Sequence, residues 1–222
     1  MSFMRPKYIT FDCYGTLTNF QMGPLTRELF ADRVAAEQMD LFVKDFAAYR
    51  LDQVMGDWRP YDEILDTAIS RVCKRWGVEY RGEGRLYYDA VPTWGPHADV
   101  TAGLAKIADK IPLVILSNAM DEQIMANVDK LGVPFHKVFT AQQAQAYKPR
   151  LQAFEYLLDN LGCGPEDLLH VSSSFRYDLM PAEDMQIKHK AFVARGHEQP
   201  GNACYNYRQI ADISELPGLV GL

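Results

Sequence analysis

The sequence predicts an α/β protein, built as a doubly wound parallel sheet with a block of helices inserted after the first strand. Three observations support this fold class. Short β-rich runs alternate with helical patterns over most of the chain. The runs are continuously apolar, which is typical of parallel strands covered on both faces. Only residues 19–91 break the alternation, because they hold helical patterns and no clear strand, so we expect a separate helical cap domain there.

The expected strands are short apolar runs that end in polar residues. They lie at 7–11, 111–118, 167–174 and 189–195, with a weaker candidate at 136–143. Helical patterns lie between them at 98–109, 121–133 and 150–163. The last two patterns close on Gly132 and Gly162, and glycine suits the left-handed conformation that commonly ends a helix.

The inserted block contains three helical patterns, at 24–38, 41–55 and 60–78. The segment "VPTWGP" at 91–96 then brings two prolines, which stop helices and mark the return to the sheet. We therefore predict a core domain formed by residues 1–18 and 92–222, and a cap domain at 19–91.

Composition restricts the classes of function. The 222 residues carry a net charge of −6, with 48% hydrophobic and 23% charged residues, a balance typical of an ordinary soluble globular protein. No lysine and arginine cluster marks a surface for nucleic acid or anionic lipid, and no apolar run is long enough to span a membrane. The N-terminus lacks the apolar segment of a signal peptide, so we expect a cytoplasmic protein. The scattered cysteines favour reduced thiols over a zinc cluster or a disulfide framework; they are Cys13, Cys73, Cys163 and Cys204.

Ligands of an open α/β sheet bind beyond the carboxyl ends of its strands. Asp12 stands at such an end, and Gly15 and Thr16 follow it. The glycine permits a tight turn, and the threonine offers a hydroxyl and an amide to a ligand. A carboxylate held in this loop can act as a covalent nucleophile, although an acid at a strand end can equally be an ordinary loop residue.

Partners for Asp12 are expected from later loops. A buried carboxylate needs a positive partner to stay ionised, and Lys148 in "AYKP" offers one unless it is a solvated surface lysine. Ser117 and Asn118 precede a helix, where amides bind an anion, but both residues are also good N-caps.

The segment "HVSSSFRYDLMPA" at 170–182 follows another predicted strand. Asp178 lies five residues beyond Ser173 in this segment. The stretch could therefore line a pocket with hydroxyl groups and one carboxylate, although the serines alone are weak evidence.

Together, "FDCYGTL", "LSNA", "YKP" and "HVSSSFRYDLMPA" resemble, in this order, the four loops of the haloacid dehalogenase superfamily. The resemblance covers essentially the whole chain, cap included, and implies a Rossmann-like core. Phosphatases of that superfamily carry a second acid where this chain has Tyr14, and a glycine and an aspartate where it has Ser172 and Ser173. Without those carboxylates a hard dication would lack oxygen ligands.

The pattern "DxYGTL" with a serine-rich fourth loop instead resembles the (S)-2-haloacid dehalogenases, which use no metal. A halide is a weak base and leaves without a proton, so a general acid would have no task. The resemblance implies that short (S)-2-haloalkanoic acids become (R)-2-hydroxy acids through an aspartyl ester, with no cofactor.

The resemblance also implies the catalytic roles. Asp12 is the nucleophile, Lys148 keeps it anionic, Asp178 activates the hydrolytic water, and Ser173 positions that water. The residues implied in substrate and halide binding are Cys13, Tyr14, Thr16, Arg50, Ser117, Asn118 and Tyr177.

Arg50 depends on one local match. The segment "YRLDQVMG" resembles the cap-helix segment that carries the halide-binding arginine, although an arginine on an amphipathic helix is more often plain surface. With Asp12 on the core and Arg50 on the cap, the pocket is expected at the seam between the two domains.

Two positions depart from these dehalogenases. Phe154 stands where a tyrosine is frequent, and Phe175 stands where an asparagine lies near the hydrolytic water. Two alternatives therefore stay open: a Mg²⁺-dependent phosphatase of the same superfamily, and a non-catalytic binding member. Dehalogenases of this type often form dimers, so a homodimer is an option, and the expected partner is a small 2-haloacid.

Overall fold

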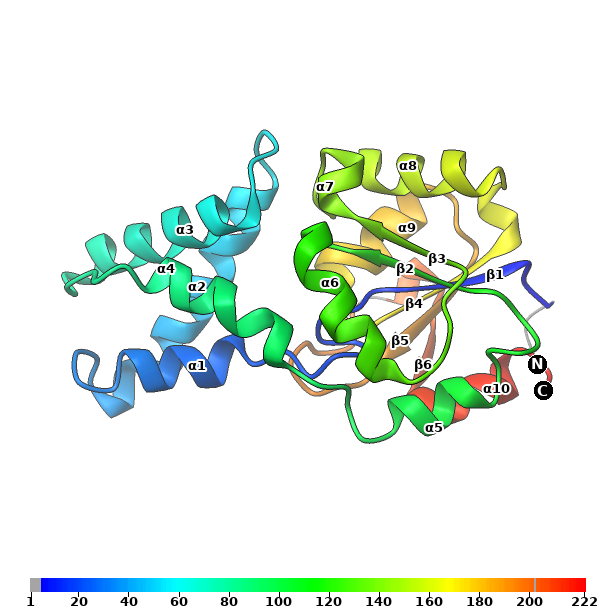
Figure 1. Cartoon of the computed structure of the whole chain (residues 1–222), viewed down its shortest axis with the longest axis horizontal. Helices are drawn as coiled ribbons and strands as arrows, with labels where there is room; N and C mark the ends of the chain where they lie inside the picture. Colours follow the sequence, from blue (N-terminus) through cyan, green and yellow to red (C-terminus); the bar gives the residue numbers. More distant parts are fainter. Residues whose placement is uncertain (1–4, 202) are drawn as a thin grey trace. The chain divides into compact units, whose positions relative to one another are not determined.

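The computed structural model describes residues 5–201 and 203–222. The chain forms two compact units, one made of Met1–Asn19 with Gly95–Leu222 and the other of Phe20–Trp94. Figure 1 follows both along the chain by colour. The predicted cap, 19–91, corresponds to the second unit, and whether this unit works as a cap over the site stays a prediction.

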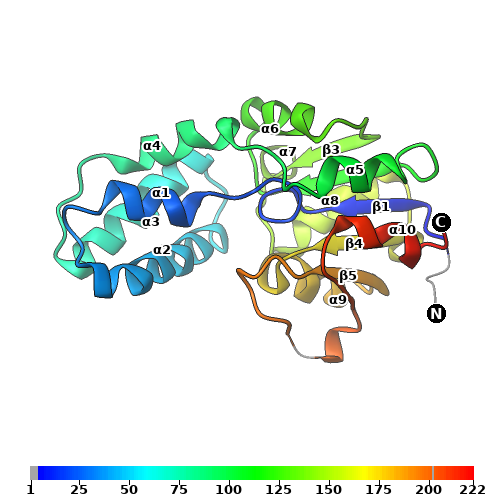
Figure 2. The ribbon, with the colours of Figure 1, turned by 90° about the horizontal axis from the view of Figure 1, so that it is seen from below.

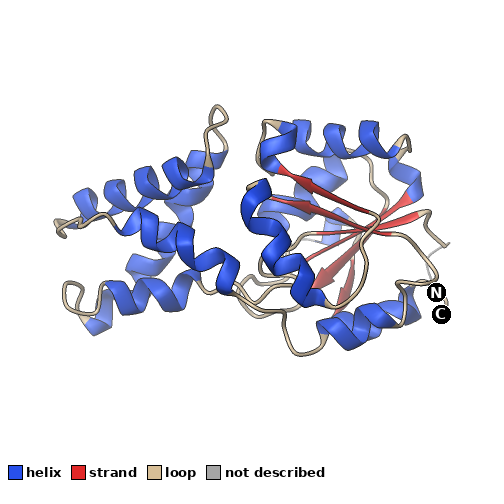
Figure 3. Ribbon diagram, in the orientation of Figure 1, coloured by secondary structure: helices blue, strands red, loops and turns tan. Residues whose placement is uncertain are grey.

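The first unit is built on a six-stranded sheet in which every strand pair is parallel (Figure 3). The spatial order is β3-β2-β1-β4-β5-β6. The strands are β1 (Tyr8–Phe11), β2 (Leu113–Ser117), β3 (Lys137–Thr140), β4 (Leu168–Ser172), β5 (His189–Val193) and β6 (Arg208–Ile210). The predicted α/β fold with a parallel sheet is confirmed.

Helices cover both faces of this sheet, as Figures 1 and 2 show from two directions. One face carries α5 (Val100–Ala105), α6 (Asp121–Val128) and α10 (Leu216–Leu219). The other carries α8 (Leu151–Leu161) and α9 (Met180–Asp184), while α7 (Ala141–Ala144) directly follows β3. The six helices and the crossovers between parallel strands make the fold doubly wound.

Strand β2 shows why the core strands read as continuous apolar runs. Leu113 and Ile115 belong to the hydrophobic cluster under α5 and α6, whereas Val114 and Leu116 belong to the cluster under α8. Successive side chains of a strand point to opposite faces, and here both faces are buried. The positions from Leu113 to Leu116 are therefore all apolar, and the polar Ser117 comes only at the carboxyl end of the strand.

The second unit consists of helices: α1 (Met22–Leu29), α2 (Met39–Val54), α3 (Tyr61–Trp76) and α4 (Glu83–Ala90). Its core contains the aromatic side chains Phe30, Phe42, Phe46 and Tyr87, all essentially inaccessible to solvent. Helix α3 carries acids in its first turn and bases in its last, and it ends on Gly77 with φ of 64°. Helix α4 was not distinguished in the sequence, and the predicted helix 24–38 already ends at Leu29.

Two features of the first unit differ from the sequence prediction. The predicted strand 136–143 ends at Thr140, because the Thr140 hydroxyl accepts a hydrogen bond from the Gln143 amide at 3.1 Å and starts α7. Strand β6 was missed, since it has three residues and two of them, Arg208 and Gln209, are exposed. Among the described residues, no helix combines the length and apolar character needed to cross a membrane.

The close packing of α5 gives a test of the fold. A Cβ on Gly103 would lie 2.9 Å from the backbone carbonyl carbon of Ile213, which cannot move aside. Gly103→Ala should therefore destabilise the protein by about 1–3 kcal/mol, the usual cost of overpacking. Urea unfolding measures the effect. The control is Gly218→Ala, because nothing lies within 4 Å of the added methyl, and it should change stability by less than about 0.5 kcal/mol. Equal effects would contradict the packing.

Candidate active site

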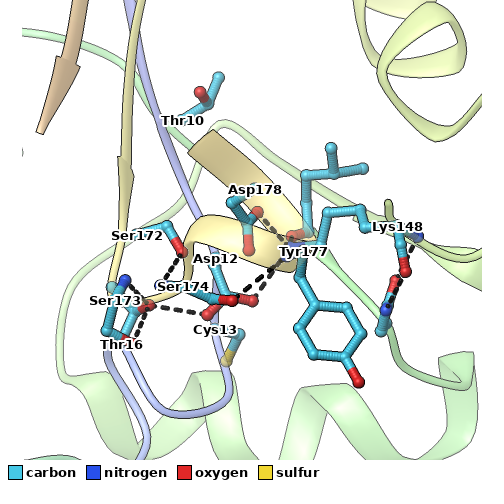
Figure 4. Close-up of polar contacts among 12 residues, drawn as sticks. Thr10, Asp12, Cys13, Thr16, Lys148, Ser172, Ser173, Ser174, Tyr177 and Asp178 are labelled. Carbon is cyan, nitrogen blue, oxygen red and sulfur yellow. Dashed lines mark hydrogen bonds and ion pairs between the residues drawn. The ribbon is translucent and has the colours of Figure 1, made fainter. Parts of the chain in front are cut away.

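Asp12 directly follows β1 and projects its carboxylate into a nearly closed environment. The residue is 7% exposed, and its backbone amide donates to Val171 of β4 at 3.1 Å. Each carboxylate oxygen accepts one hydrogen bond, Oδ2 from the Thr16 hydroxyl at 2.7 Å and Oδ1 from the Lys148 ammonium at 3.0 Å. The carboxylate is thus held in one orientation at the carboxyl edge of the sheet (Figure 4).

Lys148 is buried, with 1% of the residue exposed, and its ammonium group has three acceptors. They are Asp12 Oδ1 at 3.0 Å, Asp178 Oδ1 at 2.6 Å and the carbonyl oxygen of Leu116 at 2.8 Å. An ammonium group has three N–H donors, so all of them are used. The predicted pairing of Lys148 with Asp12 is present in the structure, and the surface alternative is wrong.

Asp178 lies on a turn of π-helix, Phe175–Leu179, that follows β4. The Ser174 hydroxyl caps this turn by accepting from the Tyr177 amide at 3.2 Å. Both donors to the Asp178 carboxylate bond the same oxygen, Oδ1: Lys148 at 2.6 Å and His170 Nε2 at 3.0 Å. Oδ2 is buried and has no hydrogen-bond partner among the described residues.

The charges of the three groups are interdependent. Burial raises the pKa of Asp12, and Asp178 raises it further, against the opposing effects of Lys148 and Thr16. Burial alone would raise the pKa of Asp178, but Lys148 and His170 outweigh it, so the pKa lies below its ordinary value. Burial would likewise lower the pKa of Lys148, and the two carboxylates raise it instead. Lys148 is therefore cationic, and Asp12 is the carboxylate more readily protonated, a perturbation common at functional sites.

The loop after Asp12 is fixed from several directions. Thr16 Oγ1 accepts from the Ser173 amide at 2.9 Å and lies 3.0 Å from the Ser173 hydroxyl. Arg195 donates two hydrogen bonds to the Thr16 carbonyl oxygen at 2.9 and 3.1 Å while it pairs with Asp99. These contacts bring Ser173, as predicted, next to the Asp12 loop.

Two histidines also touch this loop. His97 Nε2 lies 3.1 Å from the Gly15 carbonyl oxygen, and His197 Nε2 lies 3.2 Å from the Ser173 hydroxyl. Burial lowers the pKa of both histidines, so both are neutral at pH 7. Gly15 has φ of 97°, a conformation that side chains rarely adopt.

The Asn118 amide and the Lys148 backbone bond each other reciprocally. Asn118 Nδ2 donates to the Lys148 carbonyl at 2.8 Å, and Asn118 Oδ1 accepts from the Lys148 amide at 2.7 Å. Asn118 thus positions Lys148, which sequence reasoning did not foresee, and its predicted role at the halide stays a prediction. Ser117 is buried beside it, and its hydroxyl has no hydrogen-bond partner in the described ranges.

Three further residues predicted to bind the substrate or the halide are Cys13, Tyr14 and Tyr177. The Cys13 thiol is packed in the core, where burial raises its pKa to about 12, so it is not a thiolate at neutral pH. The Tyr14 hydroxyl donates to Asn127 Oδ1 at 2.9 Å. Tyr177 precedes Asp178 on the π-helical turn and is half-buried (Figure 4). The binding roles predicted for Cys13, Tyr14 and Tyr177 stay predictions.

Arg50 lies on α2 in the helical unit. Its guanidinium group stacks over the rings of Phe20 at 5.2 Å and Phe46 at 5.0 Å. Its Nε is buried and has no hydrogen-bond partner in the described part of the chain. These contacts hold the guanidinium in place, and its predicted role in halide binding stays a prediction.

Phe154 and Phe175, the two residues that depart from the dehalogenase pattern, both pack in hydrophobic clusters. Phe175 contacts Phe192 and Tyr207 in an aromatic cluster, with ring centroids 4.6 and 4.9 Å apart. Phe154 is buried on α8, with its ring 5.4 Å from that of His170. Sequence reasoning missed His170, which lies within β4 in the run that was predicted as a strand.

The comparisons with known proteins agree with this fold. A family model for haloacid dehalogenase-like hydrolases matches residues 6–185, so the chain belongs to this family. The resemblance seen in the four loops is thereby confirmed. A search of curated protein sequences found no match.

Solved structures of the same fold include three informative neighbours. A dehalogenase solved with an intermediate complex is 20% identical, with a TM-score of 0.82 over 99% of both chains. An L-2-haloacid dehalogenase from Xanthobacter autotrophicus with chloropropionic acid covalently bound is 20% identical, with a TM-score of 0.77 over 97% of this chain and 98% of that one. YfnB from Bacillus subtilis, assigned to the HAD-hydrolases and solved bound to magnesium, is 17% identical, with a TM-score of 0.80 over 98% and 100%. At these identities the likeness shows the fold.

The ion pairs of Lys148 with Asp12 and Asp178 predict how the stability of the protein depends on pH. Lys148→Met leaves Asp12 and Asp178 buried without their cation, which should cost about 3–5 kcal/mol near neutral pH. Folding then raises the pKa of both carboxylates above their unfolded values, so the penalty shrinks as pH falls. In the wild type, the lowered pKa of Asp178 gives stability that is lost only as pH falls below the ordinary value of 3.8, so it stays constant between about pH 7 and about pH 5. Urea unfolding at about pH 7 and about pH 5 should show the two proteins converging.

Lys190→Met is the matched control. Lys190 is equally buried, but its partner Glu183 keeps 36% of its side chain exposed. Lys190→Met should therefore lose less stability than Lys148→Met, and the loss should depend less on pH between about pH 7 and about pH 5. A deficit of Lys148→Met that stays constant between the two pH values would contradict the charge coupling.

Proposed function

We propose that this hydrolase cleaves the carbon–halogen bond of short (S)-2-haloalkanoic acids and releases (R)-2-hydroxyalkanoic acids. The observation that carries the proposal is Tyr14, which stands where a proton donor for an alcohol leaving group would stand. Its hydroxyl donates to Asn127 on α6. A halide leaves without a proton, so the substrate class fits a site without that acid. The neighbour from Xanthobacter autotrophicus, which holds covalently bound chloropropionic acid, supports the same chemistry.

In the first step, a carboxylate oxygen of Asp12 attacks C2 of the substrate from the side opposite the halogen. The new C–O bond forms as the carbon–halogen bond breaks, and the electron pair leaves with the halide. Lys148 and Thr16 hold the nucleophile at 3.0 and 2.7 Å. The Ser117 hydroxyl, with amides of the first loop, is the proposed donor to the substrate carboxylate. Configuration at C2 is inverted, and the product is an ester of Asp12.

In the second step, water attacks the carbonyl carbon of the Asp12 ester and gives a proton to Asp178. The acyl C–O bond breaks, and the departing alkoxide takes up that proton to become the 2-hydroxy acid. The other proton of water is lost as Asp12 ionises again. Asp178 Oδ2 is the acceptor available for this water, since Lys148 and His170 both bond Oδ1.

The proposed reaction uses no metal. Within the described residues, no group of three or more histidine, cysteine or acidic side chains could hold an ion. The serines at 172 and 173 replace the acid that would join Asp12 and Asp178, and hard dications require several oxygen ligands. A Mg²⁺-dependent phosphatase is the second candidate, and magnesium in the neighbour YfnB is the observation that favours it. The cytoplasmic location stays a prediction.

Halide release tests the proposal. Incubation with (S)-2-chloropropionate should release many equivalents of chloride per chain, at the same rate with and without a chelator. Asp12→Asn should abolish turnover, because a neutral amide is a poor nucleophile. Chloride is measured with a halide electrode and the acid products by chiral chromatography.

Each other outcome points to one alternative. Metal-dependent hydrolysis of an aryl phosphate with no chloride release would establish the phosphatase. Release of one equivalent only, with a mass increase on Asp12, would show a trapped ester. No reaction with either substrate would favour the non-catalytic binding member.

Arg50 gives a separate test within this function. We propose that its guanidinium stabilises the departing halide, together with Asn118, because a weakly hydrated cation suits that anion. Arg50→Ala should lower kcat/KM by about two to three powers of ten, the effect of removing one transition-state donor. Arg50→Lys should recover part of the loss. The loss should be larger for chloride than for bromide, whose weaker bond to carbon needs less assistance.

The matched control is Arg71→Ala on α3. Arg71 also stacks on an aromatic ring and pairs with Asp52 at the surface, so its removal should leave kcat/KM unchanged. Thermal unfolding checks that both variants fold. If Arg50→Ala keeps activity within about threefold of wild type, Arg176 and Arg59 become the next candidates for the halide partner.

A further inference from the structure

His170 links Thr10, inside the sheet, to Asp178 in the candidate active site through two hydrogen bonds. It lies on β4, opposite Thr10 of β1 in the parallel register, and the residue is fully buried. Its Nδ1 lies 2.8 Å from the Thr10 hydroxyl, and its Nε2 lies 3.0 Å from Asp178 Oδ1. One ring thus connects the middle of the sheet to the carboxylate proposed to activate water.

The two contacts select one tautomer of the ring. The Asp178 carboxylate is ionised beside Lys148, so it accepts a hydrogen bond and requires a proton on His170 Nε2. The Thr10 hydroxyl is close to Nδ1, at 2.8 Å, and farther from the Leu169 carbonyl oxygen, at 3.5 Å. Thr10 therefore donates to Nδ1, which leaves the ring neutral with its proton on Nε2.

We propose that His170 is a positioning residue, which holds the Asp178 carboxylate so that Oδ2 faces the hydrolytic water. This inference rests on the proposed function. Two donors on Oδ1 oppose rotation of the carboxylate about its Cβ–Cγ bond. Oδ2 is left buried and without a partner among the described residues. A buried acceptor without a donor is costly unless water or a ligand supplies one.

The surroundings of the ring exclude a role as a proton carrier to solvent. Phe154 on α8 packs edge-on against it, and the charged groups that face it are Asp178 and, through that carboxylate, Lys148 and Asp12. His170 keeps its Nε2 proton throughout, because the proton of the attacking water goes to Asp178 Oδ2. The ring acts on hydrolysis of the ester and leaves its formation unaffected.

The two steps can be separated by rapid mixing of enzyme and (S)-2-chloropropionate. His170→Phe should still release a first equivalent of chloride at close to the wild-type rate. Steady turnover should then fall by about 10–100-fold, part of the 10²–10⁴ that a positioned base contributes. Loss of a donor that lowers the pKa of Asp178 should also move the acid limb of kcat to higher pH.

Conservative variants distinguish a role in positioning Asp178 from a general disturbance of the structure. His170→Gln keeps an N–H donor at a similar reach and should restore much of the turnover, while Thr10→Val should give an intermediate loss. His136→Gln, an exposed histidine that precedes β3, is the control and should change neither step. An equal loss in both steps, or no gain of Gln over Phe, would overturn the proposal.

A measurement without substrate separates this inference from the proposed function. Nitrogen NMR of histidine-labelled wild-type protein, assigned with His170→Gln, should show Nε2 protonated and Nδ1 as an acceptor. A ring protonated on Nδ1, or on both nitrogens, would overturn the inference whatever the substrate. Absence of chloride release from wild type together with the expected tautomer would instead overturn the dehalogenase function, and with it the hydrolytic role given to His170.

Discussion

The ammonium group of Lys148 determines how much negative charge the site can hold. Asp12 and Asp178 are both buried, and two carboxylates facing each other without a cation would not both ionise. Lys148 contacts both, and its third hydrogen bond goes to the Leu116 carbonyl near the end of β2. One side chain thus links residues that follow or belong to three adjacent strands, β2, β1 and β4. The geometry of the site depends on the order of these strands in the sheet.

That order places the site at a particular point of the fold. The chain proceeds from β1 outward through β2 and β3, then returns to the other side of β1 and proceeds through β4, β5 and β6. The connections that leave β1 and β4 lead to opposite sides of the sheet at this reversal, where open α/β sheets bind their ligands. Asp12 follows β1, and Asp178 lies on the π-helical turn that follows β4. The topology alone therefore brings both carboxylates to one place.

The parallel sheet and the position of the site at its carboxyl edge could be predicted from the sequence, because strand ends are local features. The runs ending near Asp12, Ser117 and Ser173 were recognisable, and a parallel sheet gathers such ends on one edge. The pairing of Lys148 with Asp12 was predicted, but the other long-range hydrogen bonds of the site were not. Nothing in the local sequence indicates that Asn118 bonds the backbone of Lys148, 30 residues later. Strand β6 was also hidden, since an exposed three-residue edge strand has no apolar pattern.

The histidine was missed for a more instructive reason. His170 lies inside a run read as a buried strand, where a polar residue is uninformative unless its neighbour across the sheet is known. The parallel register of β1 and β4 sets Thr10 opposite it, and this pairing satisfies Nδ1. The ring can then direct Nε2 along the strand toward Asp178.

The neutral charge of this histidine completes the electrostatic argument. The site holds two carboxylates and one ammonium, so it carries a net charge of about −1 when all three are ionised. A second acid at position 14 would add another negative charge, and such a site would then need a dication. Tyr14 instead directs its hydroxyl to Asn127, and Phe154 and Phe175 add packing without charge. His170 supplies a hydrogen-bond donor to Asp178 without changing this balance, and Lys148 is the cation that both carboxylates contact.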